Sequence, residues 1–345
     1  MSYFGAGASS PIPNLKGTFV DDGFFQLVQH LGSGRTAEVY HALDITSREE
    51  DPIYYAVKCM RNDAPGSKRV AALRNEFSIH KSVSHLQGVV TFHGVFSEGE
   101  EGELLFMVLD AASTNMFDAI VKCRLYVDRP ALIKKAFYQV LDAVEECHDA
   151  GVYHRDLKPA NILCNNQGTG IRLADFGSAT RDEESTGFKC GSLAYMSPES
   201  VDPTRAIYSS RQSDLWAVAM ILFALITGTT PWPVADLSDP RYAAFRAEEA
   251  NYLIETFHLT RAAASFFRWC FALEPAHRPS IDEMYHAVRD MQRFSLAHTS
   301  ELHSVAAAAV VRAHRPVAPD FRFVDRGKMS VTTRQRFASK MRRVY

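Results

Sequence analysis

The chain has 345 residues, 46% of them hydrophobic and 23% charged, a balance that is ordinary for a globular protein with a sizeable core and that excludes a fibre or a wholly disordered chain. Its formal net charge of −2 is unevenly distributed, because residues 312–345 hold ten Lys or Arg against two Asp, which is +8 and leaves −10 for the rest. This basic tail is expected to dock on the acidic body of the chain, to bind an acidic partner, or to be a solvated tail; nucleic acid is not the expected partner.

Six cysteines are scattered without a CxxC pair, and the N-terminus has no secretory leader, which argues against a disulfide framework or a zinc site. The longest apolar run, 216–226, is about half as long as a bilayer span requires, so it predicts a buried core helix and no membrane span. The thiols are expected to be reduced, in the cytoplasm, the nucleus or both.

Residues 1–23 contain GAGASSPIP and show little periodicity, so they are expected to form a flexible leader. From residue 24 to 110, short runs rich in β-branched and aromatic residues alternate with Gly, Asp and Pro, which predicts a small antiparallel sheet. Between two of these runs, apolar residues partly at helical spacing predict a helix over 68–84. The predicted strands are 24–29, 38–43, 54–60, 89–96 and 104–109.

Beyond residue 110 the pattern becomes mostly helical, most clearly over 130–150 and 214–227, with further helices between 243 and 292. The predicted fold class is therefore α+β. A small β-rich N-terminal lobe (24–110) and a larger α-helical C-terminal lobe (111–293) are joined by one linker, the functional site is expected in the cleft between them, and residues 294–345 form the C-terminal tail.

Residues 154–161 read HRDLKPAN, and Asp175-Phe176-Gly177 begins fourteen residues after Asn161. This spacing predicts two carboxylates and one amide around a single phosphate-handling site. Phosphoryl transfer from Mg-ATP uses such groups because the protein mostly positions the reactants and neutralises developing charge. Asp156 would accept or orient the proton of a hydroxyl group, and Asn161 and Asp175 would supply hard oxygen ligands to Mg²⁺.

These motifs resemble those of the eukaryotic serine/threonine protein kinases, and the resemblance implies a bilobal protein-kinase fold with ATP and Mg²⁺ as cofactors. Lys158, two residues after Asp156, is the version found in Ser/Thr kinases, where it helps to hold the γ-phosphate. The implied reaction moves this phosphate to Ser or Thr hydroxyls of a protein substrate. The alternative is a pseudokinase scaffold, which would predict loss of one of four residues that are all present: Lys58, Asp156, Asn161 and Asp175.

The segment GSGRTAEV at 32–39 resembles the kinase glycine-rich loop GxGxxGxV, except that Ala37 replaces the third glycine. Glycines are used there because backbone N–H groups approach the phosphates without a Cβ in the way. The following YAVK resembles the kinase VAIK segment, so Lys58 is expected at the α- and β-phosphates and Glu76 of the predicted helix is expected to pair with it. The residues expected around the nucleotide are Leu31, Gly32, Ser33, Gly34, Val39, Ala56, Lys58, Asp110, Ala112 and Leu163.

Residues 175–199 resemble a kinase activation segment that ends in SPE. By this resemblance, Glu199 would form a buried ion pair with Arg278, an arrangement that holds two segments in register. Asp214 would brace the backbone of the HRD loop. Within the family, the GFxCGS stretch and the long loop at 44–52 resemble those of fungal regulators of nutrient and meiotic decisions.

Arg155 beside Asp156 is a cation that needs an anion from the activation segment, and phenylalanine occupies the position where many kinases carry a phosphothreonine. Two sources of negative charge are open. Ser185 or Thr186 could be phosphorylated, or Glu183 and Glu184 could supply charge constitutively. The second interpretation is favoured, so tight regulation by an upstream kinase is not expected.

Overall fold

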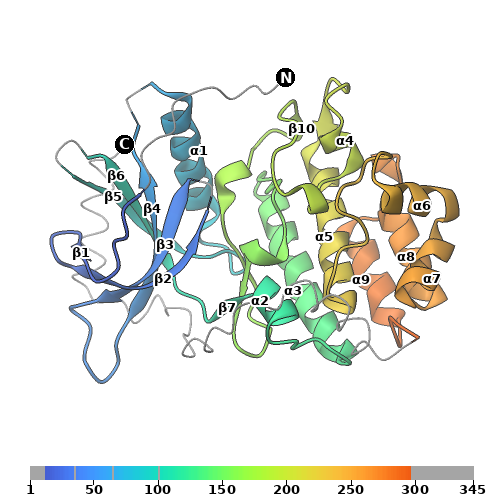
Figure 1. Cartoon of the computed structure of the whole chain (residues 1–345), viewed down its shortest axis with the longest axis horizontal. Helices are drawn as coiled ribbons and strands as arrows, with labels where there is room; N and C mark the ends of the chain where they lie inside the picture. Colours follow the sequence, from blue (N-terminus) through green and yellow to red (C-terminus); the bar gives the residue numbers. More distant parts are fainter. Residues whose placement is uncertain (1–11, 35, 64–65, 100–101, 297–345) are drawn as a thin grey trace. The chain divides into compact units, whose positions relative to one another are not determined.

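The computed structural model describes residues 12–34, 36–63, 66–99 and 102–296 (Figure 1). These residues divide into two compact units: the first holds residues 12–74 and 91–112, and the second holds 75–90 and 113–296. The first unit is β-rich and the second is mostly helical, as the α+β prediction requires. Within the described ranges, no helix is long and apolar enough to cross a membrane.

The first unit is built on a six-stranded sheet with the strand order β1-β2-β3-β4-β6-β5, in which all neighbours are antiparallel. All five predicted strands are present, but β1 lies inside the predicted leader, so ordered structure begins before residue 24. Val20 of β1 pairs with Phe25 and is buried. The strands are β1 (Phe19–Val20), β2 (Phe25–Ser33), β3 (Ala37–Asp44), β4 (Tyr54–Arg61), β5 (Phe92–Glu98) and β6 (Leu104–Asp110).

Because side chains alternate along β4, its residues divide between the two faces of this sheet, one of which is buried in the core. Tyr55, Val57 and Cys59 are fully buried in the core of the first unit, which also contains aromatic and aliphatic residues of β2, β3 and β6. Ala56 and Lys58 alternate with them and are half-buried. The sheet therefore presents the expected nucleotide-binding residues of β4 on the face opposite this core.

The second unit contains most of the helices, and the division between the units falls inside α1. The predicted helices are present, with α5 beginning four residues before the predicted start. The helices are α1 (Lys68–Val83), α2 (Met116–Val121), α3 (Pro130–Asp149), α4 (Pro198–Val201), α5 (Ser210–Thr227), α6 (Pro240–Glu248), α7 (Ala250–Phe257), α8 (Arg261–Cys270) and α9 (Ile281–Asp290). Short strands complete the unit: β7 (Thr114–Asn115), β8 (Ile162–Cys164), β9 (Arg172–Leu173), β10 (Glu184–Ser185) and β11 (Tyr208–Ser209).

Helix α5 is the centre of the second unit (Figure 1). All of its residues from 213 to 227 are buried, and the helix packs against α3 and α8. Ser209 caps its N-terminus by accepting a hydrogen bond from the backbone N–H of Gln212, and Gly228 ends it with φ 76°. The apolar run 216–226 is therefore a core helix, which confirms the prediction.

Candidate active site

The catalytic loop, residues 154–161, holds Asp156 by three contacts, one with Lys158 and two with Asn161. Lys158 Nζ lies 2.8 Å from Asp156 Oδ2 and 2.7 Å from Ser192 Oγ. The side-chain amide of Asn161 donates from Nδ2 to the backbone oxygen of Asp156 at 2.9 Å and to Oδ2 at 3.1 Å. Among the atoms that the structure describes, Asp156 Oδ1 is buried and accepts no hydrogen bond. One carboxylate oxygen is thus fixed, and the other is left as an acceptor, which suits a group that takes a hydrogen bond from a substrate hydroxyl.

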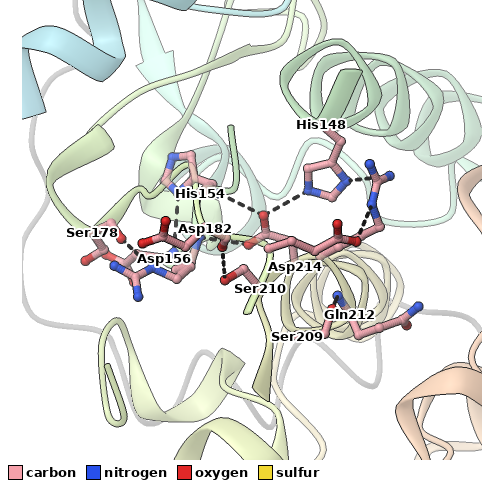
Figure 2. Close-up of polar contacts among 12 residues, drawn as sticks. His148, His154, Asp156, Ser178, Asp182, Ser209, Ser210, Gln212 and Asp214 are labelled. Carbon is pink, nitrogen blue, oxygen red and sulfur yellow. Dashed lines mark hydrogen bonds and ion pairs between the residues drawn. The ribbon is translucent and has the colours of Figure 1, made fainter. Parts of the chain in front are cut away.

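A carboxylate at the start of α5 fixes the backbone of this loop (Figure 2). Asp214 Oδ2 accepts from the backbone N–H of His154, Oδ1 accepts from that of Arg155, and both distances are 2.8 Å. His148 Nε2 lies 3.0 Å from Oδ2, and its ring and the carboxylate are almost completely buried. The predicted bracing role of Asp214 is therefore observed, whereas the contribution of His148 was not anticipated from the sequence.

Asp175 and Asn161 are linked through Ala174, the residue between β9 and Asp175. The backbone N–H of Ala174 donates to Asn161 O at 2.9 Å, and Asp175 adopts a left-handed conformation with φ 64°. The ring of Phe176, which follows, is buried between those of His80 (centroids 4.7 Å apart) and His154 (4.9 Å). This stack fixes the chain on the far side of Asp175, so both candidate magnesium ligands are held by their neighbours.

The other predicted site residues of the second unit are Glu76, on α1, and Leu163, on β8. Glu76 is buried, and its Oε2 would lie 3.2 Å from a Cβ added to Gly177, directly after Phe176. Leu163 is half-buried and pairs with Asn115 of β7. Glu76 therefore belongs to the surroundings of the Asp175 segment within its own unit.

In the first unit, the glycine-rich turn joins β2 to β3, and β3 pairs with β4 so that Val39 lies opposite Lys58. A Cβ on Gly32 would meet no atom within 4 Å, and one on Gly34 only Ala37 O at 3.5 Å, so the packing of the described residues does not require glycine at either position. Space for a ligand is a better reason for both glycines. Ala37 at the third position is buried in the sheet instead.

Ser33 and Glu38 close the base of this turn. Ser33 Oγ donates to Glu38 Oε2 at 2.7 Å, and this hydrogen bond lowers the pKa of Glu38 despite the opposing effect of burial. His30 Nε2 lies 2.6 Å from the same oxygen and also lowers that pKa. Leu31, between these residues on β2, is half-buried. The turn is thus fixed by side chains at its two ends.

Asp110 and Ala112, which are expected around the nucleotide, lie at the last position of β6 and two residues beyond it. The Asp110 side chain is buried, and its Oδ1 lies 2.7 Å from His93 Nε2 on β5. The ring of Tyr55 packs edge-on against that of His93, at 5.0 Å between centroids. His93 was not predicted, because a histidine inside an apolar strand carries no signal of the residue that it will meet across the sheet.

In the activation segment, the predicted ion pair is confirmed and the predicted source of charge for Arg155 is wrong. The buried ion pair between Glu199 and Arg278 is present, with Nη1 2.6 Å from Oε1. The charge expected from Glu183 and Glu184 does not reach Arg155: Glu183 lies 4.0 Å from Arg211, and Glu184 is exposed. Instead, the guanidinium of Arg155 donates to neutral oxygen atoms of Ser178 and Ser185.

The chain can also be placed by its similarity to known proteins. Residues 25–288 match the model of the protein kinase domain. The chain belongs to the protein kinase family. It is 30% identical to the "Negative regulator of sexual conjugation and meiosis" of Schizosaccharomyces pombe, over 75% of this chain and 58% of that protein. It is 29% identical to the serine/threonine-protein kinase VHS1 of Saccharomyces cerevisiae (64% and 50%) and 31% to ksp1 of Schizosaccharomyces pombe (72% and 52%).

The kinase-domain match supports the predicted bilobal protein-kinase fold, with its β-rich and helical lobes, and the fungal relatives agree with the resemblance noted in the GFxCGS stretch. The chain spans about half the length of these curated relatives. A protein kinase domain uses ATP, typically with Mg²⁺, and acts on protein substrates.

Proposed function

We propose that the chain is an active serine/threonine protein kinase that transfers the γ-phosphate of ATP to Ser or Thr hydroxyls of proteins, through a catalytic domain spanning about residues 24–293. The observation that carries the proposal is the state of Asp156, whose Oδ2 is held by Lys158 and Asn161 while its buried Oδ1 is left as an acceptor among the described atoms. A scaffold that only binds partners has no need of such an arrangement. The names of the relatives VHS1 and ksp1 support the Ser/Thr class.

In this mechanism, Asp156 Oδ1 accepts the hydrogen bond of the substrate hydroxyl, orients its oxygen for in-line attack and takes its proton as transfer proceeds. Lys158, between Asp156 and Ser192, places a positive charge where the transferred phosphoryl group carries negative charge. Asp214 keeps the loop backbone in this conformation, so little reorganisation is needed during the reaction.

The donor set fits a Mg-nucleotide. Asn161 uses its amide nitrogen on Asp156, which leaves the amide oxygen for a cation, and Asp175 supplies a carboxylate; both are the hard oxygen donors that Mg²⁺ prefers. When bound, the metal would neutralise phosphate charge. On the first unit, Lys58, Val39 and Ala56 would bind the α- and β-phosphates and the adenine, with backbone contacts at Gly32, Gly34, Asp110 and Ala112. Glu76 would pair with Lys58 during catalysis.

The experiment measures transfer from Mg-ATP to a mixed Ser/Thr/Tyr peptide library, with ATP binding followed in parallel by thermal shift. Wild type is expected to label Ser and Thr. Asp156→Asn and Asp175→Asn are expected to lose transfer, whereas Asp282→Asn, which changes a carboxylate that is 78% exposed on α9, retains it. ATP binding by a wild type that labels nothing would favour the pseudokinase scaffold and contradict the proposal.

The basic tail, residues 312–345, lies outside the described residues. Its charge of +8 against −10 for the rest supports a proposal that it docks on the body of the chain or on an acidic partner. Deleting it should raise kcat or remove the salt dependence of activity, and unchanged values would contradict the proposal. The six cysteines are all unpaired, which supports a reducing compartment, the cytoplasm or the nucleus.

A further inference from the structure

Arg155 connects three segments of the second unit. Its backbone N–H donates to Asp214 at the start of α5, its Nε donates to the backbone oxygen of Ser178 at 2.7 Å, and its Nη1 donates to Ser185 Oγ at 2.6 Å (Figure 2 shows the first two partners). Arg155 itself has φ 59°, a left-handed conformation that needs such support. The residue directly before Asp156 is thus held from the backbone and from the side chain.

Ser185 is fixed by a short antiparallel ladder. It lies on β10 and pairs with Tyr208 of β11, whose phenol hydroxyl donates to Gly187 O at 3.0 Å. Ser210, the first residue of α5, donates from its backbone N–H to Glu183 O at 2.7 Å and from Oγ to Asp182 O at 2.9 Å (Figure 2). The ladder and these bonds tie the activation segment to α5, the centre of the unit.

The Ser185 hydroxyl is enclosed as well as fixed. The residue is 6% exposed, and its Oγ accepts a second hydrogen bond, from the backbone N–H of Gly187 at 3.3 Å. A Cβ on Gly187 would approach Arg155 Nη1 to 3.1 Å, so the chain closes tightly around the guanidinium. Within the described ranges, no carboxylate lies within ion-pair distance of Arg155.

We infer that Ser185 is a positioning residue for phosphoryl transfer: its neutral hydroxyl, held by the β10–β11 ladder, orients Arg155 and thereby Asp156, so that the loop is competent without phosphate on the activation segment. The inference rests on the proposed kinase activity. This role differs from both alternatives that the sequence left open. Ser185 acts without being phosphorylated, and neither Glu183 nor Glu184 supplies a charge to Arg155.

Only one residue, Arg155, separates the Ser185 hydroxyl from Asp156. Asp214 clamps the backbone N–H of Arg155, and a Cβ on Gly191 would come within 2.5 Å of the Arg155 backbone oxygen. Without the Ser185 hydrogen bond, the Arg155 side chain is held, among the described residues, only at Nε by Ser178, so the left-handed backbone of Arg155 loses one of its supports. Asp156 is the next residue. A hydrogen bond to a charged group is worth enough that its loss is expected to lower kcat about tenfold.

The test uses the full chain before and after treatment with a Ser/Thr phosphatase, with complete dephosphorylation verified by intact mass. Wild-type kcat for peptide phosphorylation is expected to be unchanged by the treatment. Ser185→Ala is expected to lose about tenfold in kcat with the KM for ATP unchanged, and Ser185→Thr, which keeps the hydroxyl, to recover most of the loss. Thr186→Ala, at the exposed neighbouring position, is the matched control and should match wild type.

The possible outcomes separate the positioning role of Ser185 from the proposed kinase activity. Wild type that is active before treatment and inactive after it contradicts the inference but leaves the proposed function standing. Wild type that is inactive in both states contradicts both. A Ser185→Ala variant with wild-type kcat, or one whose thermal midpoint and KM change together with kcat, overturns the positioning role, as does a Thr186→Ala variant that loses as much activity as Ser185→Ala.

Discussion

Glu199 and Arg278 form a two-pronged ion pair inside the second unit, with Nη1–Oε1 2.6 Å and Nη2–Oε2 2.7 Å, and neither side chain is more than 1% exposed. Arg278 also donates to the backbone oxygens of Gln212 and Ala272 and stacks on Trp216 at 4.9 Å. The pair thus joins the end of the activation segment, α5 and the chain that leads into α9.

Replacing Glu199 by Gln should destabilise the protein by about 3–5 kcal/mol, because it leaves a buried guanidinium charge without its counter-ion. Urea unfolding followed by tryptophan fluorescence measures this. The matched control is Glu249→Gln, which breaks an ion pair with Arg268 whose side chains are about half exposed and should cost less than about 1 kcal/mol. Equal losses in the two variants would contradict the importance given to burial.

The same pair makes stability depend on acid pH. Burial alone would raise the pKa of Glu199, but the hydrogen bond and charge of Arg278 outweigh it and keep the pKa below 4.5. A carboxyl whose pKa is lowered in the folded state contributes stability above its unfolded pKa and loses it as pH falls through the folded value. The free-energy difference between wild type and Glu199→Gln should therefore be constant near pH 7 and shrink below pH 4.5. A difference that grows towards acid pH would contradict this sign.

Gly88 should not tolerate even a methyl group. A Cβ there would lie 2.4 Å from Ala143 Cβ and 2.5 Å from its Cα, while the Gly88 N–H is bound to Glu146 and its C=O to the N–H of Leu173. Gly88→Ala is expected to cost about 1–3 kcal/mol through overpacking. Because part of the clash is with the Ala143 methyl group, Ala143→Gly in the same chain should restore part of the loss, while the contact with the Ala143 Cα remains. Purely additive effects in the double variant would rule out this explanation.

Asp214→Asn should lower kcat by at least about tenfold and leave the KM for ATP nearly unchanged. The carboxylate accepts hydrogen bonds on both oxygens from the backbones of His154 and Arg155, whereas an amide can accept on only one. Steady-state kinetics measure the effect, with thermal unfolding to verify the fold. An increase in KM with unchanged kcat would mean that Asp214 supports nucleotide binding instead.

The sequence predicted the elements and the site residues that short-range patterns encode. Short runs rich in β-branched and aromatic residues located the five long strands, and the spacing of HRDLKPAN and DFG indicated Asp156, Asn161 and Asp175 as candidate site residues. It failed where a partner comes from a distant segment. Val89 was assigned to a strand with Phe92, but it bridges to Leu173 instead. His93 and His148 became evident only once the carboxylates of Asp110 and Asp214 lay beside them.

The activation segment shows the same limit more sharply. The sequence favoured Glu183 and Glu184 as the source of charge for Arg155, because phenylalanine occupies the position where many kinases carry a phosphothreonine and the two glutamates lie nearby in the segment. In the structure, the ladder between Ser185 and Tyr208 instead places the Ser185 hydroxyl against Arg155. This ladder could not be predicted, because two-residue strands have no periodicity that a sequence pattern can detect.

The buried helix α5 carries Asp214 at its N-terminal end, so the part of the molecule least able to accept substitutions is also the part that sets the catalytic loop. Selection for folding alone would therefore preserve most of the geometry needed for phosphoryl transfer. A descendant of this chain that abandoned catalysis would be expected to change first at Lys158, whose side chain is 24% exposed, and to keep the buried Asp214 long after it had ceased to serve a reaction.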